Sequence, residues 1–139
     1  MKIKDIMTKE VKFIEPTVTL KEAANIMREK NIGALPVGEN DQLTGVITDR
    51  DIAIRAIANG SDPKTTTVKQ AMTPKCLYCF EEDSIEETGK NMSENQVRRL
   101  PVLNKDKRLV GIVALADIIL KGSKQTAAEA LQGISQRAK

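Results

Sequence analysis

Two aspartates occupy matching places in the chain. Asp51 ends the segment G-V-I-T-D-R-D (45–51), and Asp117 ends the similar segment G-I-V-A-L-A-D (111–117). A carboxylate accepts two hydrogen bonds side by side, which suits the vicinal hydroxyls of a ribose. A helix that begins beside the carboxylate would offer free backbone N–H groups to a phosphate. Thr48 would add a hydroxyl in the first segment, whereas the second segment has an alanine at that position.

A helix-capping role explains part of the same pattern without a ligand. T-x-x-D before an apolar run is a capping box, in which Thr48 and Asp51 would satisfy the first N–H groups of a helix. Ala114 has no hydroxyl and cannot cap in this way, yet Asp117 is present. An aspartate without its capping partner suggests a second role, so the comparison of the two copies favours a binding site.

The residue types argue against catalysis and against a metal centre. Histidine is absent, which removes the commonest general base and the commonest metal ligand. No nucleophile, base and oxyanion donor converge with Asp49 and Asp51, so we expect no enzyme activity. Cys76 and Cys79 form a C-x-x-C pattern, but a structural zinc needs four ligands and no second pair is present. Two small residues on a strand are therefore favoured over a metal or redox motif.

The composition is that of an ordinary globular protein. Hydrophobic residues make up 40% and charged residues 29% of the 139 positions, and the net charge of +3 is spread along the chain. With two Phe, one Tyr and no Trp there is little material for stacking bases, so no nucleic-acid partner is expected. No apolar run approaches the ~20 residues of a membrane span. Asp5 interrupts the short N-terminal apolar stretch, which argues against a signal peptide and for a cytoplasmic location.

The chain is a tandem duplication. I-K-D-I-M-T (3–8) returns 65 positions later as V-K-Q-A-M-T (68–73), and L-P-V (35–37) returns with the same shift as L-P-V (100–102). One added residue in a turn makes the shift 66 for the two aspartate segments. The predicted divisions are unit 1–61, connector 62–67, unit 68–122 and a helical tail 123–139.

Each copy has the pattern β-α-β-β-α. Short extended segments (11–14 and 76–80) come first, and Thr19 with Glu22 and Ser84 with Glu87 then form capping boxes that open the first helices. Two short apolar runs follow as strands, and a second helix closes each unit. The fold class expected is α/β, more closely α+β, with the two units packed in pseudo-twofold symmetry over a shared core. A further amphipathic helix from Lys124 has no counterpart in the first copy and could serve dimerisation.

These features resemble a tandem pair of cystathionine-β-synthase-type (CBS) domains, the Bateman module. The duplicated unit, the L-P-V segments and G-V-I-T-D-R-D carry the likeness, which covers about residues 1–122 and is nearest to small stand-alone bacterial members. The resemblance implies a non-catalytic regulatory module that senses an adenosine-containing ligand: AMP, ADP, ATP, NAD, S-adenosylmethionine or cyclic di-AMP. It also implies a homodimer, built as a disc of four units, and an effector protein that the sequence does not identify.

The resemblance implies two clefts, each built from both units. In site 1 Asp51 would bind the ribose, Thr48 would lie near the phosphate, and the other members are Val46, Thr73, Cys76, Tyr78, Val97, Arg98 and Arg99. In site 2 Asp117 would bind the ribose, and the other members are Thr8, Phe13, Ile32, Gly33, Ala34 and Ile112. Gly33 and Ala34 stand where site 1 has its arginines, so site 1 is expected to hold a phosphate better than site 2.

A ligand-free structural protein with relic clefts is the alternative. Arg98 and Arg99 would then be a solvated face at the start of an edge strand. A fold of this kind does not guarantee a ligand, whereas the intact Thr48 and Asp51 argue against the alternative.

Overall fold

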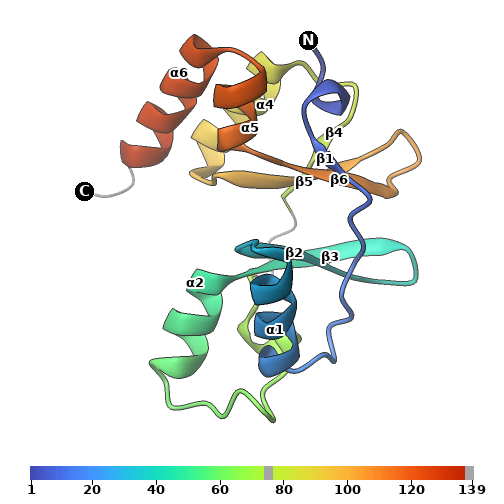
Figure 1. Ribbon diagram of the computed structural model, residues 1–139, viewed down its shortest axis with the longest axis vertical. Helices are drawn as coiled ribbons and strands as arrows, with labels where there is room; N and C mark the ends of the chain where they lie inside the picture. Colours follow the sequence, from blue (N-terminus) through green and yellow to red (C-terminus); the bar gives the residue numbers. More distant parts are fainter. Residues whose placement is uncertain (74–76, 137–139) are drawn as a thin grey trace. The chain divides into compact units, whose positions relative to one another are not determined.

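The structure is a computed structural model that describes residues 1–73 and 77–136. The chain divides into two compact units, of which unit 1 comprises Met1–Val11 and Leu77–Lys139 and unit 2 comprises Lys12–Cys76 (Figure 1). These packing units differ in their boundaries from the sequence repeat. The first eleven residues belong to the first repeat in sequence but pack with the second.

Unit 2 is a helix-covered β-hairpin. Its elements are α1 (Leu20–Lys30), β2 (Ala34–Glu39), β3 (Gln42–Thr48), α2 (Asp49–Asp51), the π-helical segment η2 (Ile52–Ile57) and α3 (Val68–Ala71). Strands β2 and β3 pair antiparallel, with Ala34 opposite Thr48 and Val37 opposite Gly45. The core side chains come from all of these elements except α2: Leu20, Ala23, Met27, Leu35, Val37, Ile47, Ala56, Val68 and Ala71.

Unit 1 contains a four-stranded sheet with helices. Its elements are η1 (Ile3–Asp5, a 3-10 turn), β1 (Thr8–Lys9), β4 (Cys79–Phe80), α4 (Ile85–Asn95), β5 (Arg99–Leu103), β6 (Leu109–Ala114), α5 (Leu115–Lys121) and α6 (Lys124–Ser135). The strand order is β1-β6-β5-β4, with β4 parallel to β5 and the other pairs antiparallel. The mixed α+β fold and the repeated order of helices and strands confirm the fold class predicted from the sequence.

The helix starts follow the predicted capping chemistry. Thr19 Oγ1 accepts the N–H of Glu22 at 3.3 Å. Ser84 Oγ accepts the N–H of Glu87 at 3.0 Å, and the Glu87 carboxylate accepts the Ser84 N–H at 3.3 Å, which completes a capping box. These bonds satisfy backbone donors that have no partner inside the helix, so each helix begins at the residue that the sequence indicated.

The N-terminal segment is held tightly in unit 1. Ile3 is fully buried, and its N–H donates to Asp83 O at 2.9 Å. The ammonium groups of Lys2 and Lys4 lie 2.5 and 2.8 Å from the exposed Glu82 carboxylate. Their hydrogen bonds, from Lys2 first and Lys4 second, lower the pKa of Glu82 to about 2. The contact joins the start of the chain to the turn before α4.

The predicted C-terminal helix is confirmed as α6, which packs against α4. A Cβ on Gly133 would lie 1.6 Å from Ser93 Oγ, and a Cβ on Gly89 would lie 3.0 Å from Thr126 Cγ2. The absence of side chains at these two glycines therefore allows the helix backbones to approach closely. Ala127 and Ala130 of α6 are both buried, and the Ala130 Cβ would lie 3.7 Å from a Cβ on Gly89.

One of the predicted strands does not form, and another is shorter than expected. Residues 11–14 form no strand, and Ile14 makes only a single parallel bridge to Val37. The preceding Glu10 has a left-handed backbone (φ 61°), which interrupts extended pairing after β1. In the second copy the strand is Cys79–Phe80 rather than residues 76–80, and Cys76 lies outside the described residues.

The second helix of the first copy also has a different form. Ala58 N–H donates to Ala53 O at 3.0 Å, and Ser61 N–H donates to Ala56 O at 2.9 Å, a spacing of five residues that is typical of a π-helix. Its counterpart α5 is a regular α-helix.

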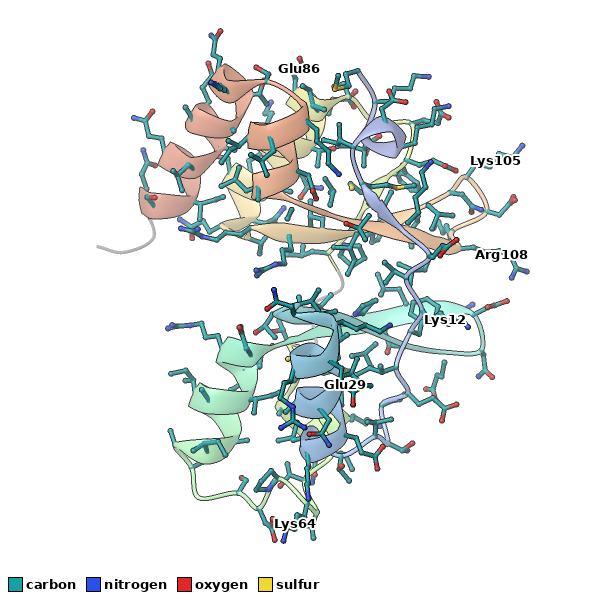
Figure 2. All side chains as sticks on the ribbon, viewed as in Figure 1. Lys12, Glu29, Lys64, Glu86, Lys105 and Arg108 are labelled. Atoms are coloured by element: carbon teal, nitrogen blue, oxygen red, sulfur yellow. The ribbon has the colours of Figure 1, made fainter. Side chains whose placement is uncertain are left out.

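Charged side chains of both signs project from the surface. Lys64, Glu86 and Lys105 are exposed examples (Figure 2). This agrees with the dispersed charge of the sequence.

Candidate functional site

Asp51 and Thr48 form a complete capping box at the start of α2. Asp51 N–H donates to Thr48 Oγ1 at 3.0 Å, and Thr48 N–H donates to Asp51 Oδ2 at 2.9 Å. The extended backbone of Thr48 (φ −117°, ψ 162°) is the geometry of an N-cap residue. The structural role proposed for T-x-x-D is therefore confirmed.

The other carboxylate oxygen of Asp51 is also engaged. The Thr73 hydroxyl donates to Asp51 Oδ1 at 3.4 Å, and Arg55 Nε lies 3.8 Å from the same atom. Arg55 also donates from Nη1 to Met72 O at 3.3 Å. The Asp51 side chain is only 12% exposed, whereas that of Arg55 is 48% exposed. Both oxygens of this carboxylate thus already have partners within unit 2.

Unit 2 brings four of the predicted site 1 residues together. Val46 forms an isolated bridge with Thr73, which holds Thr73 beside β3 and near Thr48 and Asp51. Val46 is two residues before Thr48 on the same strand, so both side chains lie on the same face of β3.

Three predicted site 2 residues, Ile32, Gly33 and Ala34, are at the same end of unit 2. Asp49 N–H donates to Gly33 O at 3.0 Å, and Ala34 pairs with Thr48. A Cβ on Gly33 would lie 2.8 Å from Asp49 Oδ2, so this glycine allows the Asp49 carboxylate to approach the backbone. Ile32 is 41% exposed.

Phe13 is separated from these residues along the hairpin. It contacts Gly38, near the turn between β2 and β3, where a Cβ would lie 2.6 Å from Phe13 Cδ1. Gly33 and Ala34 are at the opposite end of β2. The structure therefore does not group Phe13 with the other site 2 residues of this unit.

Asp117 also caps a helix, which corrects one inference from the sequence. Asp117 Oδ2 accepts the N–H of Ala114 at 2.8 Å. This half of a capping box uses the backbone of the N-cap residue and needs no hydroxyl, so the inference that Asp117 lacks a capping partner was wrong. Capping alone accounts for its presence. In the part of the chain that the structure describes, Asp117 Oδ1 accepts no hydrogen bond.

The remaining site 2 residues lie on the sheet of unit 1. Thr8 of β1 pairs with Ile112 of β6, and β6 leads directly to Ala114 and the start of α5. Thr8 and half-buried Ile112 thus lie on neighbouring strands, and Ile112 is near the end of the strand that leads to Asp117.

Arg98 and Arg99 lie close to the Asp117 segment in unit 1. Leu115 N–H donates to Arg98 O at 2.8 Å, and Arg99 pairs with Ala114. Both arginines are exposed, and neither forms a salt bridge within the described residues. Half-buried Val97 precedes them and packs on the core of unit 1.

Tyr78 is placed by its backbone and its ring. Its carbonyl accepts Asn91 Nδ2 at 3.1 Å, and its ring meets the Phe80 ring edge-on at a centroid distance of 5.5 Å.

Each predicted site draws on both packing units. Site 1 takes Val46, Thr48, Asp51 and Thr73 from unit 2 and Tyr78, Val97, Arg98 and Arg99 from unit 1, whereas site 2 takes Phe13, Ile32, Gly33 and Ala34 from unit 2 and Thr8, Ile112 and Asp117 from unit 1. The grouping across units stays a prediction. Cys76, the ninth member of site 1, lies outside the described residues.

Sequence reasoning did not single out Arg55 as a partner of Asp51. The available signal was the i,i+4 spacing of an acidic and a basic residue on one helix. The matching position in the second copy is Lys121, which forms no ion pair with Asp117 in the described residues.

A groove of about 290 Å³ lies between α4 and α6. Its lining residues include Glu86, Lys90, Thr126 and Glu129. None of the predicted site residues lines it.

Comparisons with known proteins converge on one family. A family model described as the CBS domain matches residues 3–57 and 68–124. The CBS domain-containing protein YhcV of Bacillus subtilis is 40% identical over 136 residues, which is 97% of this chain and 96% of YhcV. A crystal structure of Hypoxic Response Protein I with two coordinated zinc ions has a TM-score of 0.79 and 43% identity, with 87% of this chain and 98% of that chain covered.

A third match is to a protein with bound ligands. The CBS domain pair of protein MJ0100, in complex with 5-methylthioadenosine and S-adenosyl-L-methionine, has a TM-score of 0.76 and 30% identity, with 85% of this chain and 92% of that chain covered.

The chain has no histidine, and the described residues contain no group of three or more His, Cys, Asp or Glu able to hold a metal ion. Cys79 is buried, and burial raises the pKa of its thiol to about 12, so the thiolate that a metal needs is disfavoured. The described residues also include no helix long and apolar enough to span a membrane.

The family model matches both halves of the chain, and YhcV is similar over nearly its whole length. The chain therefore belongs to the CBS-domain family, as a tandem pair of CBS domains.

Proposed function

We propose that the chain is a non-catalytic regulatory module that binds an adenosine-containing ligand, an AMP-, ADP- or ATP-like nucleotide, NAD or S-adenosylmethionine. The observation that carries the proposal is the same arrangement found in each unit. An aspartate at the start of a helix, Asp51 or Asp117, stands beside the residues that precede the L-P-V strand. The adenosine ligands of the MJ0100 domain pair support the choice of ligand class.

The arrangement offers complementary groups for a nucleotide. Asp117 has one oxygen that no donor of the described residues uses, and a carboxylate suits ribose hydroxyls. In site 1, exposed Arg98 and Arg99 offer bidentate donors to the phosphate oxygens of a nucleotide. The two sites predicted around Asp51 and Asp117 are part of this proposal. We also propose that Asp51 contributes more to ligand binding than Asp117 does.

Ligand binding would act on the relation between the two units. A ligand held by residues of both units gains different interaction energies in different arrangements of those units, so it shifts the population among them.

The proposal is tested by thermal unfolding of the full chain with AMP, ATP and S-adenosylmethionine. A ligand that binds only the folded state at 100 times its Kd stabilises it by about 2.7 kcal/mol. Asp51→Asn and Asp117→Asn retain an acceptor oxygen for the cap but remove the charge. Since hydrogen bonds to charged groups contribute about 1.5–3 kcal/mol, each variant should weaken binding at its own site about tenfold or more.

Glu86→Gln is the matched control, because Glu86 is an exposed carboxylate that lines the α4–α6 groove and not a predicted site. Unchanged melting temperatures with every ligand of the panel, at millimolar concentration, would refute the proposal.

We also propose a homodimer. The second helices of the two units expose large apolar side chains: Ile54 at 53%, Ile57 at 55%, Ile119 at 41% and Leu120 at 80%. Ile54 and Leu120 are equivalent in the repeat, so each unit would present a similar apolar face to a second copy. The expected mass in light scattering is that of two chains, and Leu120→Lys should reduce it to that of one chain.

The cytoplasmic location stays a prediction.

A ligand-free structural protein is the second candidate, and one observation favours it. Both oxygens of Asp51 are already used by groups of unit 2. The same ligand panel separates the two candidates, because a purely structural protein gives no shift with any of its members.

A further inference from the structure

We propose that Arg55 competes with the nucleotide for Asp51 and thereby sets the affinity of this carboxylate. The inference rests on the proposed nucleotide binding and goes beyond it by assigning a role to a residue outside the predicted sites. A ribose that pairs with Asp51 has to displace a donor that the chain itself supplies.

The geometry places three groups around one oxygen. Asp51 Oδ1 receives the Thr73 hydroxyl at 3.4 Å and faces Arg55 Nε at 3.8 Å. Arg55 Nη1 donates at 3.3 Å to the carbonyl of Met72, the residue before Thr73. Arg55 therefore bridges the carboxylate and the backbone that positions the second donor.

The second oxygen cannot serve in place of the first. Asp51 Oδ2 accepts the Thr48 N–H at 2.9 Å as part of the helix cap. Two vicinal hydroxyls need both oxygens of one carboxylate. A ribose hydroxyl at Oδ1 therefore competes with the nearby Arg55 guanidinium and the Thr73 hydroxyl, whereas Oδ2 can keep the cap bond while it accepts a second donor.

The repeat supplies an internal comparison. Asp117 keeps the cap bond to Oδ2, but within the described residues its Oδ1 has no donor. The residue four positions on is Lys121, at the last position of α5, and it forms no ion pair with Asp117. Only one of the two otherwise similar carboxylates carries a competing guanidinium.

The expected change in affinity at Asp51 follows from the solvent exposure of the Arg55 side chain. Arg55 is about half exposed, and ion pairs of this kind alter an equilibrium by about 1.4-fold to fivefold. Removal of the guanidinium should therefore tighten binding at Asp51 by about 1.4-fold to fivefold. A direct contact between Arg55 and a nucleotide phosphate predicts the opposite sign.

The test is isothermal titration of the full chain with AMP. The Kd assigned to Asp51 is that of the binding that Asp51→Asn removes. Arg55→Ala is expected to lower this Kd by about 1.4-fold to fivefold, Arg55→Lys to lower it less, and the control Lys121→Ala to leave it unchanged. Circular dichroism of each variant checks that the fold is retained.

The possible results distinguish a failure of the Arg55 competition from a failure of nucleotide binding itself. An AMP Kd that is unchanged or raised by Arg55→Ala, or AMP binding that Asp51→Asn does not affect, overturns the competition while nucleotide binding stands. No heat of binding with AMP, ATP or S-adenosylmethionine, in either wild type or Arg55→Ala, overturns the proposed function and the competition with it. Binding in Arg55→Ala alone supports the competition in its strongest form.

Discussion

Replacement of Thr88 by valine is expected to stabilise unit 1. Thr88 lies on α4 and is 1% exposed, and among the described residues its hydroxyl has no partner at hydrogen-bonding geometry. The Cys79 thiol is near enough that the Thr88 hydroxyl offsets part of the rise in its pKa, but sulfur is a weak acceptor. The hydroxyl is therefore buried with little compensation.

The expected gain can be worked out from these facts. A buried polar group without a partner costs about 1–3 kcal/mol, and the weak contact with Cys79 favours the lower end of that range. Valine keeps the branched shape and has nearly the same helix propensity as threonine. We therefore expect Thr88→Val to raise the free energy of unfolding by about 1 kcal/mol.

The assay is urea unfolding followed by circular dichroism. The midpoint should rise while the slope with urea stays the same, because the surface exposed on unfolding hardly changes. Thr88→Ser is the matched control, since it keeps the hydroxyl and loses a buried methyl group, which should cost about 1 kcal/mol. A Thr88→Val variant less stable than wild type would refute the reasoning, because the hydroxyl would then have a partner worth more than its burial.

Three further predictions concern other parts of unit 1. Gln96 follows α4 with a left-handed backbone (φ 55°), a conformation that glycine adopts without strain. Gln96→Gly should therefore raise the free energy of unfolding, measured with urea, by about 0.5–1 kcal/mol. An unchanged free energy of unfolding would show that the backbone of Gln96 is not strained. Gly133→Ala should destabilise by about 1–3 kcal/mol because the new Cβ meets Ser93 Oγ, and Ser93→Gly in the same chain should restore part of the loss. The pKa of Glu82 is lowered in the folded state to about 2, so its stabilising effect is present above its ordinary pKa of 4.5 and is lost as pH falls toward 2. Acid unfolding of Glu82→Gln should therefore lack part of the wild-type loss of stability between pH 4.5 and 2, and identical acid profiles would count against the contact.

The sequence predicted the features that depend on local pattern. The capping pairs Ser84–Glu87 and Thr48–Asp51 formed as expected because each needs only residues three positions apart. The repeat gave the order of strands and helices for the same reason. Local periodicity is preserved in a duplicated chain whatever its partners are.

The features that sequence reasoning missed depend on contacts between distant segments or on the backbone. Pairing of Thr8 with Ile112 brings the start of the chain to the second copy, and no local pattern indicates that partner. The cap on Asp117 was missed because its donor is the Ala114 backbone, which every residue type carries. Arg55 was missed because a half-exposed i,i+4 pair resembles many surface pairs with no further role.

The route of the chain has a consequence for the cooperativity of folding. Residues 12–76 leave unit 1 after Val11 and return to it at Leu77, so in topological terms unit 2 is a guest domain inserted into a host. While the guest is unfolded, the host must close a long flexible loop, whose entropic cost grows with the logarithm of its length. Once residues 12–73 are folded, much less flexible chain remains in that loop. Folding of one unit therefore changes the stability of the other through chain entropy alone, even if their surfaces share no contact.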